Sequence, residues 1–404
     1  MKRTIIILLT FIWIAGQMKA QGWLSVQAVG VLPNNSPEVN RQHLQQAIDK
    51  MSPLGGVLYV EPTQGGYPME GGLVLKRNVT LLGAHGPTGR GTALPDRSGP
   101  TGSLFVITDR EHPFLTVESA TQVRGIQFYY PEQSYQDESQ IIAYPPTIRL
   151  AQDQRVLGVT LSCLSFYGEY MAMDFRAKAP YYCEQTLFEH CYGYPLSGQF
   201  IAINRCYDVP RILHCHVNPA NMREFKREFK PNVVDAVVRK KTYSYWIDYT
   251  DNAVLMDLFS FGVYGGIFLG NESYGQLTNF NFDCVCIGIH KMGCNWKNRN
   301  WQIAQGSIIA NVGERQEDVH PILIEGIGHT SLSNVECFSG PNPAVTTLGA
   351  SWDFITVRDE ASVTLTGCRM QGYKADKPIN VSDKAQLHAF GCFDKDNKPL
   401  EQTY

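Results

Sequence analysis

Short runs of alternating apolar and polar residues recur along most of the chain, and one small or turn-prone residue interrupts each run. In the segment SLSNVECFSG, residues 331–340, Asn334 is the interrupting residue. After it, Glu336 stands between Val335 and Cys337. Because alternate residues of a strand share a face, this pattern predicts two short strands joined by a tight turn, with the apolar side chains inside and Glu336 outside.

The same arrangement occurs at six other places, where the interrupting residues are Gly125, His190, His214, Asp257, Asn279 and Gly367. The regular steps are 22 residues from Asp257 to Asn279 and 33 residues from Asn334 to Gly367, each about one solenoid coil. No amphipathic helices separate these strands, which argues against alternating strands and helices. The repeat therefore predicts an all-β fold, a single-stranded parallel β-helix whose stacked coils bury a continuous core.

Two intervals depart from the repeat. The long step from Asn279 to Asn334 leaves room for one more coil, which we place at WQIAQGSIIANV, residues 301–312. Residues 219–241 break the pattern and carry many charges, as in REFKREFKPN. We interpret them as an insertion or long turn beside an outer groove, with its charges solvated.

Ahead of the coils, the segment NNSPEVNRQHLQQAIDKM, residues 34–51, predicts one helix. Ser36 suits the N-cap and Pro37 the first helical position. The apolar residues that share one side of this helix are Val39, Leu44, Ala47, Ile48 and Met51. We expect the helix to cap the first coil, because an open end would expose apolar core and unpaired strand edges.

The N-terminus combines Lys2 and Arg3 with an apolar run from Ile5 to Ala15 and a short polar stretch that ends at Ala20. This is the pattern of a secretory signal peptide, residues 1–20, because the apolar run is too short to span a bilayer. Residues 21–404 are then the mature chain, predicted as one β-helix domain. We expect an exported protein, periplasmic or extracellular, with no membrane span after cleavage.

The composition of the chain excludes several kinds of binding partner. A net charge of -3 gives no basic field for nucleic acid or an anionic membrane, so neither is expected as a partner. None of the 11 cysteines forms a CxxC pair, which leaves structural zinc unsupported. Cysteines at inward positions of the repeat, predicted to belong to the core, are Cys191, Cys215, Cys337 and Cys368.

A family resemblance rests on VGVLPNNSPEVNRQHLQQAIDKMSPLGGVLYVEPTQGGYPMEGGLVLKRNVTLLG, residues 29–83. This segment resembles the N-terminal signature of the pectate lyase or pectin lyase-like superfamily. The segments VRGIQFYYPEQ, TYSYWIDYTDNAVLMDLFSFGVYGGI and NRNWQIAQGSIIAN resemble a bacterial branch of rhamnogalacturonase and pectate-lyase-type proteins. The resemblance implies a right-handed parallel β-helix and an activity on polysaccharides or oligosaccharides, either as a lyase or as a glycoside hydrolase.

The outward residues after each turn form a strip rich in aromatic and amide side chains, which suits a ligand that presents both ring faces and hydroxyl groups. The residues expected to contact a glycan substrate are Tyr192, Tyr194, His216, Asn218, Asn281 and Arg299. An alternative also stays open for the aromatic members, because outward tyrosines can pack beneath long turns.

Two carboxylic acids on the strip suggest glycoside hydrolysis, which needs an acid paired with a base or nucleophile. Asp283 and Glu336 lie about two coils apart, or roughly 9–10 Å, which suits an inverting pair. Asn281-Phe282-Asp283 resembles the Asn-Thr-Asp signature of polygalacturonases. However, residues 303–305 read Ile-Ala-Gln where that family has an Asp-Asp pair, which weakens the match to its mechanism.

A lyase is the alternative. Tyr245-Trp246-Ile247-Asp248-Tyr249 resembles the Trp-Ile-Asp-His segment of pectate lyases. Elimination from a uronate needs a cation at the carboxylate and a base, such as Arg, Lys or a His/Tyr pair. Asp248 is the candidate calcium ligand, and the candidates for cation or base are His290, Lys291 and Arg299. No cofactor is required, although calcium fits this alternative.

The third alternative is a β-helix that binds glycans without cleaving them, because fold alone does not settle function. We favour an exported glycoside hydrolase over a lyase, with Asp283 and Glu336 as its catalytic pair.

Overall fold

The computed structural model describes residues 22–86, 101–293, 300–310, 319–337, 353–371 and 378–403. The predicted signal peptide lies outside these ranges and stays a prediction, as does the proposed role of Arg299 in substrate binding. In the described part of the chain, no helix is long and apolar enough to cross a membrane.

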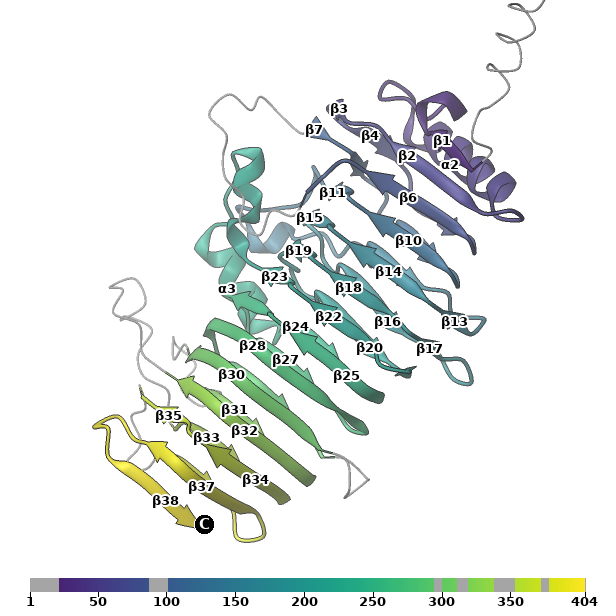
Figure 1. The fold of residues 1–404 in the computed structure, drawn as a ribbon. Coiled ribbons are helices and arrows are strands. Elements are labelled where there is room, and N and C mark those ends of the chain that lie inside the picture. The colour runs from purple at the N-terminus through teal and green to yellow at the C-terminus, as the bar shows by residue number, and fades with distance from the viewer. Residues whose placement is uncertain are drawn as a thin grey trace, which may run out of the picture.

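Parallel strands stack one coil upon the next along the whole molecule (Figure 1). One side of the stack is an eleven-stranded sheet. Its strands are β5 (Leu73–Leu75), β9 (Leu115–Val117), β12 (Ile148–Leu150), β16 (Met173–Arg176), β20 (Ile201–Asn204), β24 (Tyr243–Ile247), β27 (Gly265–Leu269), β29 (Ile287–Lys291), β31 (His320–Ile324), β33 (Ile355–Val357) and β36 (Ile379–Val381). Each pairs in parallel with the corresponding strand of the next coil, so the predicted parallel β-helix is confirmed.

A larger sheet of 25 described strands forms the other sides and bends at a corner within each coil. Before the corner lie β2 (Gly56–Val60), β6 (Val79–Gly83), β10 (Thr121–Arg124), β14 (Val159–Ser162), β18 (Leu187–Glu189), β22 (Arg211–Leu213), β25 (Thr250–Met256) and β34 (Glu360–Thr366). After it lie β4 (Tyr67–Met69), β8 (Leu104–Ile107), β11 (Gln127–Tyr129), β15 (Ser165–Tyr167), β19 (Tyr192–Gly193), β23 (His216–Val217), β26 (Phe259–Phe261) and β35 (Arg369–Met370). Four described strands run through the corner: β28 (Ser273–Val285), β30 (Trp301–Ala310), β32 (Ile327–Cys337) and β37 (Gln386–Phe393).

The remaining strands of the large sheet lie at its ends and edges. These are β1 (Trp23–Ser25), β13 (Val156–Leu157), β17 (Cys183–Glu184), β21 (Cys206–Tyr207) and β38 (Pro399–Thr403). β38 pairs antiparallel with β37 and so ends the stack. A separate antiparallel pair joins β3 (Thr63–Gln64) to β7 (Thr101–Gly102).

Every predicted turn residue adopts the left-handed conformation at the corner. Their φ angles are 68° at Gly125, 50° at His190, 55° at His214, 53° at Asp257, 54° at Asn279, 53° at Asn334 and 64° at Gly367. Gln305, at 56°, fills the same position in the extra coil predicted for residues 301–312. Asn, Asp and His tolerate this conformation better than most residues, which explains their choice here.

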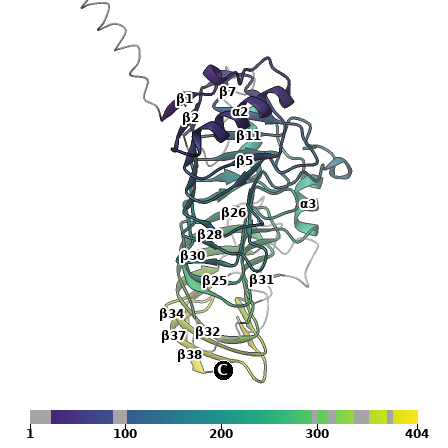
Figure 2. The same ribbon diagram turned by 90° about the vertical axis from the view of Figure 1, so that its right-hand side faces the viewer.

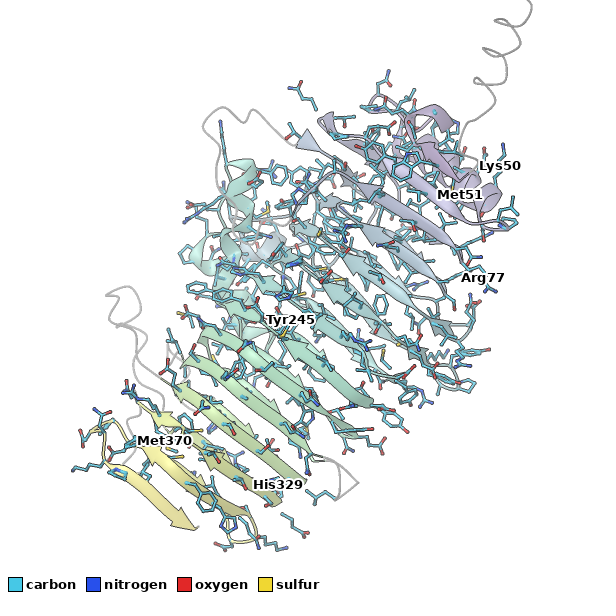
Figure 3. The ribbon with its side chains drawn as sticks, in the orientation of Figure 1. Lys50, Met51, Arg77, Tyr245, His329 and Met370 are labelled. Carbon is cyan, nitrogen blue, oxygen red and sulfur yellow. The ribbon has the colours of Figure 1, made fainter. Side chains whose placement is uncertain are left out.

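The core is the continuous interior of the coils. Val335 and Cys337 are buried on either side of the exposed Glu336, as predicted. The cysteines predicted in the core are also buried, and Cys183 and Cys206 are register partners on adjacent coils. The buried Met51 and Met370 lie near opposite ends of the stack, with the buried Tyr245 between them (Figure 3).

The predicted capping helix is α2 (Pro37–Met51), and it covers the first coils (Figure 1). The Ser36 hydroxyl accepts a hydrogen bond from the Val39 backbone N–H, as an N-cap does. Leu44, Ala47, Ile48 and Met51 are buried as predicted, but Val39 is exposed. Asn40 is buried instead, where its side chain bonds the backbone of Leu32 and Pro68.

The interruption at residues 219–241, which we call the insertion, is mostly helical. It contains the 3-10 helix η3 (Pro219–Phe225) and the helix α3 (Pro231–Arg239). Another short 3-10 helix, η2 (Glu138–Gln140), packs against α3, and η1 (Gln27–Val29) lies near α2. α3 projects from the side of the stack (Figure 2).

The corner conformation gives a test at Asn334. We expect Asn334→Ala to lower the free energy of unfolding by about 1 kcal/mol relative to Asn334→Gly, because a Cβ opposes the left-handed conformation and glycine has none. Denaturant unfolding monitored by circular dichroism measures the difference. At the neighbouring strand residue Ser333, the control pair should show the opposite order, with Ala more stable than Gly. Equal stability of the two Asn334 variants would contradict the corner role.

Candidate functional site

The predicted outer strip exists as a row of register partners on the large sheet. It runs through Tyr192, His216, Phe259, Asn281, Ser307, Glu336 and Arg369. The His216 ring stacks on Phe259, with ring centroids 4.1 Å apart. Tyr192 is half-buried beside His216, and burial raises the pKa of its phenol to about 12. The row therefore keeps its predicted outward direction.

Two predicted substrate contacts are covered by the insertion, and both are corrections. Tyr194 is fully buried, its hydroxyl donates to the Gly262 carbonyl at 2.6 Å, and its ring lies 5.3 Å from Phe229. Asn218 is only 7% exposed, and its side chain caps the N-terminus of η3. The open alternative, aromatic packing beneath a long turn, is the one realised at this end of the strip.

The other end of the strip is accessible. A hollow of about 400 Å³ is lined there by Gln305, Gly306, Ser307, Asn334, Val335, Glu336, Gly367 and Arg369. The Oδ1 of Asn281, two coils earlier in the same row, is buried and has no hydrogen-bond partner among the described residues. Arg299, another predicted substrate contact, lies outside the described residues.

Asp283 and Glu336 share the outer face but not the row. Asp283 stands two residues beyond Asn281, and Asn281 is the residue aligned with Glu336 two coils away. Two coil steps and two residues along the strand give roughly 12 Å between their backbone positions. This is longer than the 9–10 Å expected from the repeat, because that estimate counted only the coil steps. Burial raises the pKa of Asp283, whose Oδ1 accepts a hydrogen bond from the Cys284 thiol.

A second group of side chains lies on the outer face of the eleven-stranded sheet. One row of register partners there consists of Trp246, Phe268, His290, Leu323 and Thr356. The Trp246 and Phe268 rings are stacked, with centroids 3.9 Å apart. Around them is an apolar cluster separate from the core, made of Tyr243, Tyr264, Phe268, Cys286, Ile287 and Leu323, with Val238 of α3 against it. We call this surface the aromatic shelf.

A chain of hydrogen bonds crosses the aromatic shelf. The Tyr243 hydroxyl lies 2.8 Å from His290 Nδ1, and His290 Nε2 lies 2.8 Å from Glu325 Oε2. Arg358 holds the other oxygen of Glu325, at 3.3 Å. The His290 side chain is 16% exposed and that of Glu325 is 21% exposed, so the chain is neither fully buried nor freely solvated.

The charge of Glu325 determines which atoms donate in this series of hydrogen bonds. The hydrogen bond from His290 lowers the pKa of Glu325, so the group is a carboxylate at neutral pH and can only accept. We therefore assign the Nε2–H of His290 as the donor to Glu325. In the neutral form of the ring, Nδ1 then carries the lone pair, which accepts the Tyr243 O–H. A base held in one tautomer by a carboxylate can take the proton of a hydroxyl group, the arrangement that activates such groups in enzymes.

Of these hydrogen-bonded residues, only His290 was a candidate from the sequence. Tyr243 and His290 are 47 residues apart, and His290 and Glu325 are 35 apart. No local motif connects them, so only the stacking of the coils could reveal the group. Tyr243 lies two coils before His290, and Glu325 follows the strand of the next coil.

Of the other candidates for the lyase alternative, one is buried and one faces outward. Lys291, considered as a cation or base, is 1% exposed and its Nζ donates to the Ile327 carbonyl at 3.0 Å. This correction follows from the register, because Lys291 lies in the inward row with Leu269 and Ile324. Asp248 faces outward, as predicted, and burial raises its pKa. In the described ranges, no three His, Cys, Asp or Glu side chains are grouped to hold a metal ion.

Asp283 provides a test of site electrostatics. Its raised folded-state pKa means that its contribution to stability is present below the unfolded-state pKa of about 4 and is lost as pH rises through the folded-state pKa. We expect Asp283→Asn to raise the Tm at pH 7 and to leave it unchanged near pH 3, as measured by calorimetry. The control, Glu336→Gln at an exposed position, should change neither value. A lower Tm for Asp283→Asn at pH 7 would show that the buried charge is compensated.

Comparisons with known proteins place the fold. No protein family and no curated protein sequence match the chain. A tailspike double mutant of E. coli bacteriophage HK620, in complex with a pentasaccharide, has a TM-score of 0.56 at 12% identity, over 93% of this chain and 67% of that one. DFA-IIIase from Arthrobacter chlorophenolicus A6, in complex with GF2, has a TM-score of 0.51 at 11% identity, over 92% and 94%.

The gp42 tailspike of Acinetobacter phage vb_AbaP_AS12 has a TM-score of 0.52 at 9% identity, over 96% of this chain. This chain spans 65% of the length of that tailspike. Identities this low show similarity of fold alone. The chain is therefore similar in fold to tailspikes and to a DFA-IIIase.

Proposed function

We propose that this protein is an exported carbohydrate-active enzyme that binds an oligosaccharide or polysaccharide across the aromatic shelf. The observation that carries the proposal is the hydrogen-bonded chain Tyr243–His290–Glu325 beside the stacked Trp246 and Phe268. Aromatic faces suit the apolar faces of sugar rings, and a polar chain beside them suits proton transfer. Two proteins of similar fold were determined with a pentasaccharide and with GF2, which supports a saccharide ligand.

In this proposal the phenolic oxygen of Tyr243 exchanges a proton with the substrate. His290 Nδ1 takes the phenolic proton while the oxygen accepts one from the substrate, and Glu325 stabilises the imidazolium that forms. Arg358 holds Glu325 in place from the far side, so the carboxylate remains aimed at Nε2. Positioned proton transfer of this kind contributes typically ~10²–10⁴-fold to a rate.

This arrangement fits elimination best, because a lyase must remove a proton from carbon. A His/Tyr pair is one of the bases expected for that reaction, and the aromatic shelf contains such a pair. The Arg358 side chain, 47% exposed, contacts Glu325, the partner of His290, and supplies a positive charge that would attract the substrate carboxylate. The product of elimination carries a double bond that absorbs ultraviolet light.

Hydrolysis at the outer strip is the second candidate, and one observation favours it. Asp283 has a raised pKa while Glu336 is exposed to solvent in the neighbouring hollow, and different environments are what assign the acid and base roles to two carboxyl groups. The separation of roughly 12 Å between their backbones would need both side chains to lean together to approach the inverting range.

Paired variants distinguish the two candidates. We expect Tyr243→Phe and His290→Gln each to lower kcat/KM by about 10²-fold or more on a substrate that the wild-type protein cleaves, because each removes a member of the proton chain. The matched controls, Asp283→Asn and Glu336→Gln, should keep at least about half of the activity. Screening plant, algal and host glycans for both ultraviolet absorbance and reducing ends identifies the substrate and the reaction.

The opposite pattern would assign the reaction to the strip. Loss of activity in Asp283→Asn or Glu336→Gln, with reducing ends but no absorbance, would indicate the hydrolase and contradict a catalytic Tyr243. Glycan binding without any cleavage would indicate the non-catalytic alternative.

Calcium dependence has its own test. If calcium assists elimination through Asp248, EDTA should abolish cleavage, and Asp248→Asn should raise the calcium concentration that restores it by about tenfold, because one carboxylate ligand is lost. Activity assays across a calcium titration measure both effects. Full activity in EDTA would exclude Asp248 as a required calcium ligand.

A further inference from the structure

A second histidine and carboxylate lie on the same face, one coil beyond His290. His320 is on β31, and Asp353 and Thr356 belong to the next coil, at β33. His320 Nδ1 lies 3.3 Å from Thr356 Oγ1 and 3.7 Å from Asp353 Oδ1. The Thr356 hydroxyl donates to Asp353 Oδ2 at 2.5 Å. The proposed function assigns no role to these three residues.

Burial of Asp353 determines the orientation of His320. Asp353 is 5% exposed, and its Oδ1 has no hydrogen-bond donor among the described residues other than the approach of His320. A buried carboxylate is costly unless donors or a cation face it. The Thr356 proton is already directed at Asp353, so the Thr356 oxygen can accept from His320. Both neighbours therefore favour a proton on His320 Nδ1, which leaves Nε2 as the nitrogen that exchanges a proton with a ligand.

The position of His320 relates it to Tyr243. The two residues lie in one row of register partners, Tyr243, Gly265, Ile287 and His320. Three coil steps separate their backbones by roughly 14 Å. The Tyr243 ring lies directly over Gly265, where a Cβ would come within 2.1 Å of it, and its hydroxyl reaches toward His290 on β29. β29 is the strand next to β31, so the side chain of Tyr243 shortens the gap to His320.

The floor of this gap is apolar. Ile287, 4% exposed, is the residue between Gly265 and His320, and Leu323 lies beside it in the same apolar cluster. A sugar ring placed on this floor would have the Tyr243 oxygen at one side and the His320 ring at the other. The His320 side chain is 15% exposed, which leaves it within reach of such a ligand.

We propose that His320 is the second proton-transfer residue of this site and donates a proton to the departing sugar oxygen, with Asp353 and Thr356 as its positioning residues. The inference rests on the proposed function. In the elimination, the Tyr243 oxygen takes the proton from the substrate carbon and passes its own proton to His290. The bond from the neighbouring carbon to the glycosidic oxygen breaks as the double bond forms, and that oxygen takes the Nε2 proton of the His320 imidazolium. Water then returns one proton to His320 and removes one from His290.

One experiment tests which ring nitrogen of His320 keeps its proton, and it needs no substrate. In protein labelled with 15N-histidine, correlation spectra through a pH titration report the protonation of each ring nitrogen, and His320→Gln assigns the signals. We expect His320 to keep its Nδ1 proton and to lose the Nε2 proton as pH rises. Asp353→Asn should shift the neutral form toward the other tautomer, while Asp353→Glu should restore the wild-type pattern. Loss of the Nδ1 proton in the wild-type protein would overturn the proposed orientation.

The second experiment tests His320 as a proton donor by changing the leaving group of the substrate. We expect His320→Gln to lower kcat/KM on the natural glycan by about 10²-fold, because the departing oxygen then lacks a proton donor. On a substrate whose leaving oxygen is that of a nitrophenol, which departs without protonation, the loss should be less than about tenfold. Tyr243→Phe should lose activity on both substrates. The matched control is His329→Gln on β32, because His329 is also half-buried and bonds Ser362 away from this face (Figure 3).

The outcomes separate the two proposals. If the wild-type protein cleaves a glycan and His320→Gln loses equal activity on both substrates, or none on either, this inference fails while the proposed function stands. If Tyr243→Phe retains full activity on the cleaved glycan, the proposed site fails, and His320 loses its partner with it.

Discussion

The structure depends on one constraint, the in-register parallel pairing of each coil with the next through a left-handed corner residue. At every corner the backbone must turn so that both strands keep their hydrogen bonds to the coils above and below. Asn279, Gln305 and Asn334 occupy this conformation on three successive coils. Because the side-chain period of a strand is two residues, the corner residue also decides which side chains face inward on both arms.

The same constraint builds the surface. Residues in corresponding positions of successive coils form rows about 4.8 Å apart per step, whatever their distance along the chain. Side chains of neighbouring rows also meet, and in this way Tyr243, His290 and Glu325 come into hydrogen-bond contact from three separate coils, although they are not register partners. A site on such a surface is assembled by register, and a one-residue slip would turn its members into the core. The glycines of these strands contribute space, as at Gly265, where the Tyr243 ring occupies the place of a side chain.

Departures from the repeat decide which part of the surface is available. The insertion folds back over the earlier coils, where Phe225 stacks on Tyr129 at 4.3 Å between ring centroids. It buries Tyr194 and uses Asn218 as a helix cap, so the strip is accessible only beyond it. α3 also contributes Val238 to the aromatic shelf, so one segment both closes part of one surface and borders another.

The sequence by itself determined the coil pattern, because alternation and turn chemistry are local properties. It placed the seven corner residues, the outward direction of Glu336, the buried cysteines and the capping helix, apart from the exchange of Val39 for Asn40. It could not determine which outward residues would be covered or which would meet. Tyr192 and Tyr194 look alike in sequence, yet packing against the insertion, distant in the chain, buries only the second completely. Likewise, the Asp283–Glu336 spacing and the Tyr243–His290–Glu325 chain follow from coil register, which exists only once the coils have stacked.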